Sequence, residues 1–515
     1  MPSDSVQAAL DLRRMHQAGV RAVRTELVRS DWLLTLADSL GINFFQDLPF
    51  DGLSAHALIA SMDTASELAS ELAVQFEPHP SARHFGLARR SDTSNPAACA
   101  FFDAIAARFG RLRESQVYYT TVFIEDDRCA DTVDLVLLDV RDDPEPAAAL
   151  RRWNNNQATV PVGIAAVGAR VLPGAYGLLH PYSEESQARY LETHLSALLE
   201  SRIAPAAVFV YRWRDMAESP TGFGRAAIRP STYGLQTADG DMRPSGEVLQ
   251  GLYLQTRDTY VFPQGESPAK VPPWSVILGW LSYIAIAVCY RSSAPIQDIV
   301  SRYFLRRGFY QEVLRLGREL SLGPAVVLFC ALSLASGVIF SSGLWGILEI
   351  PSFRHFFLAQ SASVQPSMLA LLSSPALVPL AFSGFHAMVF ALWATLLSTA
   401  WQSDSEPDPK EMLVAVVLPL WPCLVLLAVT MVAAAGEHLM LACYALVAWP
   451  FVDLWATVQS LRDYAAITEP RPLLTWIFVL IRPGSLIVIS SAIMLLASAE
   501  TRADALFLWH LITRS

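Results

Sequence analysis

The chain has 515 residues, of which 53% are hydrophobic, and a formal net charge of −10. The acidity lies in the first half, with 25 basic and 34 acidic residues before Pro272 and 13 basic and 14 acidic residues after it. A nucleic-acid partner requires a clustered basic face, so this balance argues against nucleic acid as a partner. The uneven distribution of charge and hydropathy predicts a soluble domain followed by a membrane domain.

The first half alternates between helical and strand-like segments, as repeated βα units do. Helices are expected at 5–18, 30–40, 54–74, 97–111, 184–200 and 244–256. Short apolar runs predict seven strands, at 22–25, 42–45, 85–87, 117–123, 135–140, 162–167 and 207–213. This pattern is typical of an α/β protein of the TIM-barrel, or (β/α)8, type, which needs eight strands. Because the chain opens on a helix, we expect the first strand to precede Met1.

Residues 9–50 combine a helix, a strand ending in Arg24-Thr25, a second helix and a strand ending in Asp47-Leu48-Pro49. This order resembles the barrel of glycoside hydrolase family 2, the β-galactosidase and β-glucuronidase group. Further runs are similar to the same family: His79-Pro80-Ser81 with Phe85-Gly86-Leu87, VFVYRWRDM at 208–216, and Tyr233-Gly234-Leu235 with Asp239-Gly240 and Arg243-Pro244. The resemblance covers about residues 5–256 and implies a barrel that handles carbohydrate.

The same resemblance implies two catalytic glutamates, at the ends of the fourth and seventh strands of the family's barrel. Retaining glycosidases use one carboxyl group as acid/base and a second as nucleophile. Arg90 occupies the acid/base position, in Ala88-Arg89-Arg90, and Ala166 occupies the nucleophile position, in Ala165-Ala166-Val167-Gly168. Neither a guanidinium nor a methyl group can perform these steps. We therefore expect a catalytically degenerate barrel, a pseudoenzyme, with no cofactor.

Other polar residues at strand ends are candidate ligand contacts or substitute acids. The candidate sugar contacts are Arg24, Asp47, Arg90, Trp213 and Asp215, since an aromatic ring beside hydrogen-bonding groups suits a pyranose. Trp213 could instead cap the barrel core, and Arg90 would favour an anionic ligand such as a uronate or phosphate. The acids that could replace the lost glutamates are Glu26, Asp47, Glu125, Asp127, Asp139 and Asp215. The alternative for most of them is a role as helix caps or loop partners.

In the second half, apolar spans at 273–290, 324–348, 368–400, 412–435, 438–457 and 474–498 predict a bundle of six membrane crossings. The loop 291–322 is rich in arginine, so by the positive-inside rule it is cytoplasmic and the N-terminal domain is extracytoplasmic. The predicted domains are a barrel at 1–262, a linker at 263–272, a transmembrane domain at 273–499 and a tail at 500–515. The chain opens without an apolar signal core, so we expect an export signal upstream of Met1.

Ionisable residues within the predicted spans are His386, Asp453 and Arg482. Such residues are costly in a bilayer and are functional candidates by default. Asp453 and Arg482 could pair across neighbouring helices or snorkel separately to the cytoplasmic surface, and their position near the inner span ends favours snorkelling. The six cysteines show no metal-ligand spacing, so no metal site is expected, and pairing of Cys99 with Cys129 stays open.

Three functions fit this pattern. The leading one is a multi-pass cell-membrane protein of bacterial type whose degenerate barrel binds a glycan or a partner protein outside the membrane. The second is an active membrane-bound glycoside hydrolase that uses displaced carboxylates. The third is a transporter or assembly module with the barrel as its sensor. The expected partners are the lipid bilayer and a carbohydrate ligand or partner protein.

Overall fold

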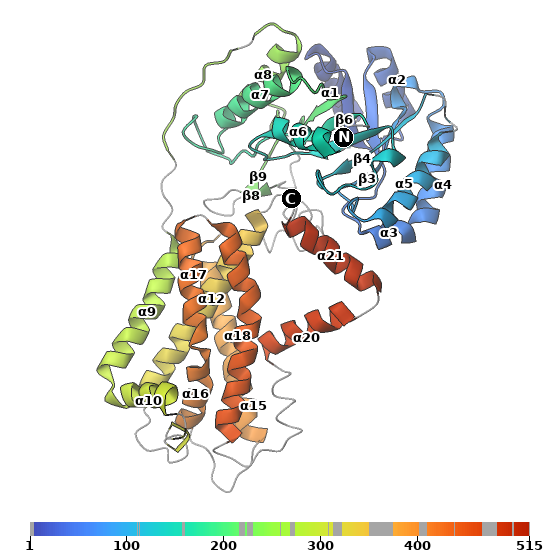
Figure 1. The fold of residues 1–515 in the computed structure, drawn as a ribbon. Helices are drawn as coiled ribbons and strands as arrows, with labels where there is room; N and C mark the ends of the chain where they lie inside the picture. Colours follow the sequence, from blue (N-terminus) through green and yellow to red (C-terminus); the bar gives the residue numbers. More distant parts are fainter. Residues whose placement is uncertain are drawn as a thin grey trace.

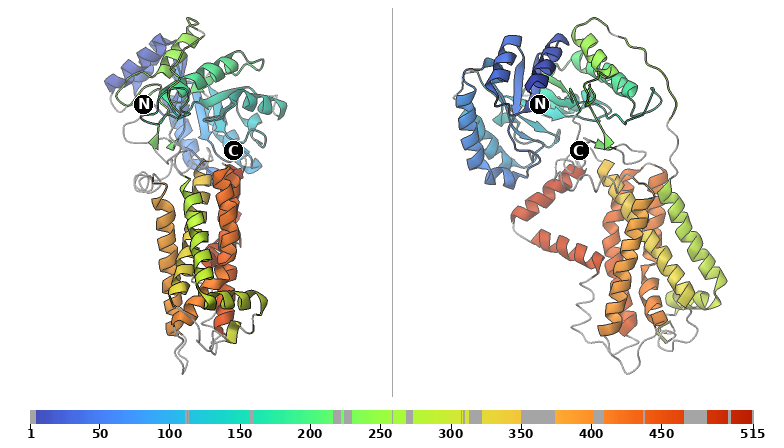
Figure 2. Two further views of the ribbon diagram at one scale, coloured as in Figure 1. Left: turned by 90° about the vertical axis from the view of Figure 1, so that its left-hand side faces the viewer. Right: turned by 180° about the vertical axis from the view of Figure 1, so that it is seen from behind.

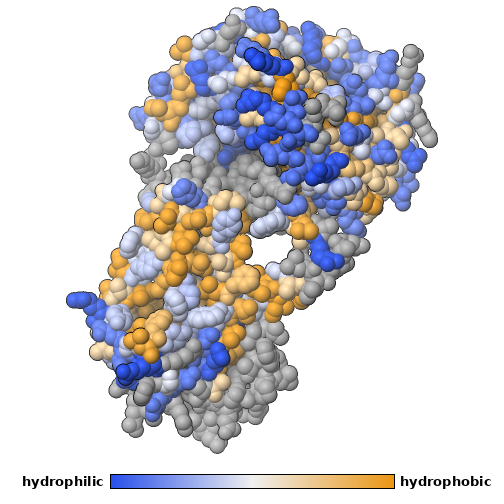
Figure 3. All heavy atoms as spheres, viewed as in Figure 1, coloured by the Kyte–Doolittle hydropathy of each residue, from blue (hydrophilic) through white to orange (hydrophobic). Residues whose placement is uncertain are grey.

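A barrel-like α/β domain and a bundle of apolar helices make up the chain (Figure 1). The computed structural model describes residues 5–110, 112, 114–156, 160–215, 222–223, 230–257, 259–267, 273–306, 308, 310–312, 322–349, 374–400, 409–436, 438–465, 482–496 and 499–513. Figure 2 shows the long helices of the bundle running side by side, away from the barrel. In the view of Figure 3, hydrophilic residues dominate the barrel surface and hydrophobic residues dominate the bundle surface. The two halves therefore differ in the polarity of the surface that this view shows.

Seven parallel strands form one sheet in the order β1-β2-β3-β4-β5-β6-β7. They are β1 (Ala22–Glu26), β2 (Asn43–Asp47), β3 (His84–Arg89), β4 (Gln116–Thr121), β5 (Leu135–Asp139), β6 (Val162–Val167) and β7 (Val208–Val210). All seven strands predicted from the sequence are confirmed. Strand β7 lies next to β1, so the sheet curls into a nearly closed barrel. The eighth strand expected before Met1 stays a prediction.

Helices and short 3-10 turns surround the sheet. They are α1 (Ser5–Gln17), α2 (Asp31–Leu40), α3 (Ala55–Ala60), α4 (Met62–Gln75), η1 (Pro80–Ala82), η2 (Pro96–Ala98), α5 (Cys99–Phe109), η3 (Ala130–Thr132), α6 (Pro146–Asn156), α7 (Glu184–Leu199) and α8 (Pro244–Tyr253), with a small antiparallel pair β8 (Gly222–Phe223) and β9 (Pro230–Ser231). The six predicted helices are present, although 54–74 is broken at Ser61 into α3 and α4. Helix α6 was not predicted, because its arginines and closing asparagines obscure its short apolar face.

Alternating side chains of the strands fill two apolar cores. In β5, Leu135 and Leu137 lie in the cluster inside the barrel with Phe45, whereas Val136 and Leu138 lie in the cluster between the sheet and the helices. This period of two is that of an extended strand, and both faces of a parallel barrel are buried. The strands are therefore positioned by packing on both sides, which fixes where their carboxyl ends point.

A disulfide joins Cys99 to Cys129, with the two Cα atoms 4.9 Å apart. Cys99 begins α5 and Cys129 precedes η3, so the bond fastens the loop after β4 to the helix before that strand. The sequence left this pairing open, since spacing alone does not bring two cysteines within bonding distance.

The described residues of the second half form mostly apolar helices. They are α9 (Trp274–Ser292), α10 (Ala294–Leu305), α12 (Leu322–Glu349), α15 (Leu377–Ala400), α16 (Pro409–Val417), η4 (Leu418–Leu420), α17 (Pro422–Ala435), α18 (Leu439–Ala465), α20 (Pro483–Leu496) and α21 (Ala499–Thr513). Within the described residues, α9, α12, α15 and α18 are long and apolar enough to cross a membrane, and α16 with α17 adds a fifth span if its 41° bend is included. These lengths are compatible with a membrane protein.

The prediction of six crossings is not confirmed. The sixth span was expected at 474–498, but residues 474–481 lie outside the described residues and α20 is 14 residues long, shorter than a bilayer requires. The bend between α16 and α17 falls at Pro419 and Pro422, which interrupt helical hydrogen bonding. The arginine-rich loop 291–322 contains helix α10. Residues 368–373 of the third predicted span also lie outside the described residues.

One histidine at the amino end of the barrel strands bridges two carboxylates. His79 Nδ1 lies 2.8 Å from Asp38 Oδ2, and His79 Nε2 lies 2.9 Å from Asp31 Oδ1. Burial lowers the pKa of His79, but the hydrogen bonds to Asp38 and Asp31 raise it more, so the net pKa lies above its usual 6.5. The charged histidine therefore stabilises the fold below about pH 6.5, and this contribution is lost as the pH rises through the raised pKa.

We expect His79→Gln to destabilise the chain by about 1–2 kcal/mol at pH 6 and by less at pH 9. The measurement is thermal unfolding of the full chain in detergent at both pH values, followed by near-UV circular dichroism. Asp31→Asn is the control, because the Asp31 side chain is 89% exposed and its loss should change stability less. An equal loss at both pH values would contradict the assigned protonation.

Candidate functional site

The carboxyl ends of the barrel strands gather charged residues of both signs, here called the mouth cluster. Its members are Arg24, Asp47, Asp51, Arg89, Arg90, Asp139 and Arg141. The carboxyl ends of parallel barrel strands meet on one face, which is where such barrels carry their sites. The cluster is thus formed by residues distant in the sequence that share one end of the sheet.

Arg24 and Asp47 form the inner part of the mouth cluster. Arg24 Nη2 lies 2.7 Å from Asp47 Oδ2, and Arg24 Nη1 donates to the Ala165 carbonyl at 3.2 Å. The Tyr118 hydroxyl donates to Asp47 Oδ1 at 2.8 Å. Gly86 allows this contact, because a Cβ there would lie 2.8 Å from the Tyr118 ring and closer still to Asp47. The group connects strands β1, β2, β4 and β6.

Arg90, at the predicted acid/base position, forms a two-point ion pair with Asp51. Arg90 Nε lies 3.0 Å from Asp51 Oδ1, and Arg90 Nη2 lies 2.5 Å from Asp51 Oδ2. The backbone of Arg90 has φ +47°, uncommon for a side chain this large, and its N–H donates to the Thr120 carbonyl at 2.9 Å. Burial raises the pKa of Asp51, but Arg90 and Arg89 lower it further, so the net pKa is below its usual value.

Ala166, at the predicted nucleophile position, is buried in β6 and lies in register with Asp139 of β5. Asp139 is held by Arg141, whose Nε lies 2.8 Å from Asp139 Oδ1 and whose Nη2 also bonds the carboxylate. Burial raises the pKa of Asp139, but Arg141 and Arg90 lower it more, so the net pKa falls. A general acid needs a raised pKa, so neither Asp139 nor Asp51 is suited to protonate a leaving group.

The structure brings Arg24, Asp47 and Arg90 together but places Trp213 and Asp215 elsewhere. Trp213 packs beside the apolar clusters on the helix side of the sheet, near α7 and α8. Asp215 accepts hydrogen bonds from the Gly234 N–H at 2.7 Å and from Arg243 Nη1 at 2.7 Å. Asp215 therefore fastens the segment after β7 to the barrel.

The remaining candidate acids also have partners. Glu26 Oε1 lies 3.6 Å from Arg89 Nη1, and Glu125 Oε1 lies 3.9 Å from Arg152 Nε. Asp127 accepts the Tyr119 hydroxyl at 2.6 Å, and burial raises its pKa, but Tyr119 belongs to the core on the helix side of the sheet. These contacts agree with the alternative that most strand-end acids are structural.

Three members of the mouth cluster, Asp51, Arg89 and Arg141, were not predicted as site residues from the sequence, and neither was Tyr118, which bonds Asp47. A signal existed for Arg141, because Asp139 and Arg141 are two residues apart at a strand end and so point to the same side. Asp51 lies beyond its strand, in a loop that pairs with the end of β3 through Gly52 N–H and the Arg89 carbonyl at 2.9 Å. That pairing could not be inferred from spacing.

The three ionisable residues singled out within the predicted spans, His386, Asp453 and Arg482, lie near one another in the bundle. Arg482 and Asp453 pair with each other, and both side chains are 1% exposed. Asp453 Oδ2 also accepts the Gly484 N–H at 3.0 Å, and the Arg482 guanidinium lies 4.2 Å from the Phe390 ring centre. His386 lies 3.3 Å from the Ser333 hydroxyl.

The preference for snorkelling of Asp453 and Arg482 is therefore wrong. Two buried opposite charges within reach neutralise each other, which removes the advantage of extending separately to water. The pair fastens the start of α20 to the middle of α18.

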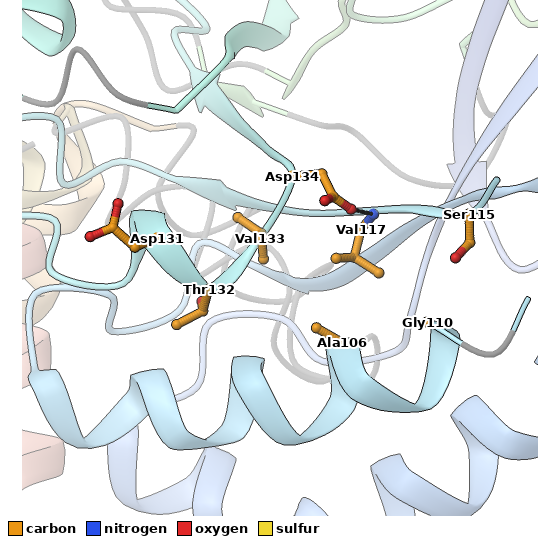
Figure 4. Close-up of a pocket in the computed structure, with 8 residues that line it drawn as sticks. All are labelled: Ala106, Gly110, Ser115, Val117, Asp131, Thr132, Val133 and Asp134. Carbon is orange, nitrogen blue, oxygen red and sulfur yellow. Dashed lines mark hydrogen bonds between the residues drawn. The ribbon is translucent and has the colours of Figure 1, made fainter. Parts of the chain in front are cut away.

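A cavity of about 280 Å³ lies at the other end of the barrel strands. It is lined by Ala106, Gly110, Ser115, Val117, Asp131, Thr132, Val133 and Asp134 (Figure 4). The Val117 N–H donates to Asp134 Oδ2 at 2.8 Å across it. Val117 is near the start of β4 and Asp134 directly precedes β5, so this cavity contains none of the predicted site residues. Within the described residues, no group of three or more His, Cys, Asp or Glu side chains is arranged to hold a metal ion.

The sequence matches no known family, and no curated protein matches it. Solved structures with a similar fold include a β-glucuronidase from an uncultured Clostridium species, at 17% identity and a TM-score of 0.42 over 49% of this chain and 47% of that one. A family 2 β-galacturonidase from Eisenbergiella tayi, bound to galacturonate, matches at 16% identity and 0.42 over 50% and 49%. The β-glucuronidase from Ruminococcus gnavus matches at 16% and 0.43 over 50% and 48%. The chain spans about half the length of these proteins.

We expect Gly86→Ala to destabilise the barrel by about 1–3 kcal/mol, because the added methyl group displaces Asp47 or Tyr118 from their hydrogen bond. Gly110→Ala is the matched control, since a methyl group there meets only backbone oxygens at 3.7 and 3.8 Å. Thermal unfolding of both variants in detergent measures the difference. Equal stability of the two variants would contradict the tight approach at Gly86.

We expect Asp453→Leu to destabilise the bundle by about 3–5 kcal/mol, because it leaves the Arg482 guanidinium buried without its counter-ion. The double variant Asp453→Leu/Arg482→Leu should recover most of this loss, since no unpaired charge remains. The melting temperatures of the two variants in detergent test the pairing. A double variant less stable than the single one would count against it.

Proposed function

We propose that this chain is a membrane-anchored, non-hydrolytic receptor whose barrel mouth binds an acidic glycan, one that carries carboxylate groups such as uronates. The supporting observation is the composition of the mouth cluster. Arg90 and Ala166 occupy the positions of the two expected glutamates, and the carboxylates of the cluster are paired with arginines. A site with ionised, arginine-bound carboxylates can position a ligand but has no acid poised for proton transfer.

Arg89 is the member of the cluster best placed to meet such a ligand. Arg89 Nη2 lies 3.5 Å from Asp51 Oδ2, and Arg89 Nη1 lies 3.6 Å from Glu26 Oε1. Both ion pairs are longer than those of Arg24 and Arg90, and the Arg89 side chain is 23% exposed. Its Nε is buried and has no hydrogen-bond partner within the described residues, so the exposed part of the guanidinium is what a ligand would meet. A guanidinium presents donors in a planar fork that matches a carboxylate, which favours a uronate over a neutral sugar. Arg24 and Arg90 are the other arginines of the mouth cluster that we assign to this binding site.

Placement of the barrel outside the membrane is part of the same proposal. The arginine-rich segment after α9 supports it through the positive-inside rule. The Cys99–Cys129 disulfide supports it independently, because disulfides persist in oxidising compartments. Membrane anchoring is supported by the four apolar helices of spanning length.

We expect Arg89→Gln to weaken binding of a polygalacturonate oligosaccharide by about 10-fold or more, since one charge-assisted hydrogen bond contributes about 1.5–3 kcal/mol. The measurement is isothermal titration calorimetry with the full chain in detergent. The matched control is Arg29→Gln, because Arg29 is an exposed arginine paired with Glu71 on the barrel surface.

The same preparation should not hydrolyse aryl β-glucuronides or aryl β-galactosides. Turnover that disappears on Asp139→Asn would overturn the proposal in favour of a hydrolase with displaced carboxylates. Equal affinity of the Arg89 and Arg29 variants for the acidic oligosaccharide would remove the mouth as its binding site.

A further inference from the structure

Helix α21 returns from the bundle to the barrel. Figure 1 shows α20 leaving the bundle beside α18 and α21 running from there back toward the barrel domain, where the chain ends. Both figures of the ribbon place α21 between the two halves of the molecule (Figure 2). The helix thus lies where the soluble and apolar surfaces of the chain meet.

One face of α21 packs against the loops that follow β2 and β4, next to the barrel mouth. Phe507 and Leu511 are 3% and 2% exposed and form an apolar cluster with Phe123. One turn earlier, Asp504 accepts a hydrogen bond from the Ser54 hydroxyl. Ser54 follows β2 and Phe123 follows β4, so the two contacts lie on either side of β3, the strand that directly precedes Arg90.

The opposite face of α21 is exposed and carries two large apolar side chains, with Arg502 one turn before them. Leu506 is 53% exposed and Trp509 is 50% exposed. At about 100° per residue, this pair points about 150° away from the pair Phe507 and Leu511. The barrel covers the second pair but leaves the first pair exposed, and a charged headgroup layer suits Arg502 beside the exposed pair.

Helix α20, which precedes α21 and contacts it, also exposes apolar side chains. In α20, Leu486, Ile487 and Ile493 are 50%, 39% and 61% exposed. Helix α20 packs on α18, a helix of membrane-spanning length, and contacts α21. Leucine and tryptophan at the end of such a surface are typical of the boundary between lipid tails and headgroups.

We propose that α21 is an interfacial helix, with Leu506 and Trp509 in the headgroup region of the bilayer and Phe507 and Leu511 on the barrel. The occupant of the exposed face is lipid. The helix then holds the mouth of the barrel against the membrane surface. This inference does not depend on what the mouth binds.

The test is photolabelling of the full chain in phosphatidylcholine and phosphatidylglycerol vesicles, with a diazirine carried near the lipid headgroup and adducts mapped to residues by mass spectrometry. We expect adducts at Leu506 and Trp509, and few at Phe507 and Leu511. The reference is the α4 peptide, whose Val74 is 78% exposed on the barrel. Leu506→Ser/Trp509→Ser should lower α21 labelling about 10-fold or more.

Labelling of α21 at or below the level of the α4 peptide would overturn the proposal, because the exposed face would then not be in lipid. Equal labelling of both faces would also overturn it, because α21 would be inserted and not held by the barrel.

The paired variant Phe507→Ala/Leu511→Ala tests the barrel face. It should accelerate hydrogen exchange of residues 50–54 and 122–124 about 10-fold or more, whereas Leu506→Ser/Trp509→Ser should not. Unchanged exchange in the first variant would contradict the docking.

Discussion

The pairing of Arg24 with Asp47 is the interaction on which the barrel mouth depends. Arg24 reaches from β1 to the carboxylate of β2 and to the Ala165 carbonyl of β6, and Tyr118 of β4 bonds the same carboxylate. A buried ion pair is stable only when its remaining donors and acceptors are also satisfied. These contacts meet that need with groups from four strands. The sheet can therefore stay nearly closed with seven strands, and its carboxyl ends are held in fixed positions.

This arrangement explains why arginines and carboxylates coexist at the mouth. Each carboxylate that is removed from water requires a cation nearby, and each arginine lowers the pKa of its partner. Asp51 and Asp139 both have lowered pKa values for this reason. The charges that stabilise the mouth thus keep these two carboxylates ionised, while the buried Nε of Arg89 has no hydrogen-bond partner within the described residues.

Much of the fold could be predicted because it depends on local patterns. Short apolar runs such as Leu135 to Leu138 identify strands, and all seven were found. Helix α6 was missed because its apolar face is only a few residues wide. The ion pairs were harder to predict from the sequence. Whether Asp453 meets Arg482 depends on how α18 packs on α20, and whether Asp51 meets Arg90 depends on the path of one loop. Sequence identifies such residues as candidates, but only packing selects their partners.

The position of the mouth limits which ligands can reach it. Ser54 and Phe123 contact α21, so the rim next to Arg90 faces the side of the barrel from which the bundle extends. If the apolar helices span a membrane and α21 rests in its headgroup layer, as proposed, this side of the barrel lies next to the membrane surface. On that placement, a glycan attached to lipid would reach the mouth more readily than a bulky soluble polymer.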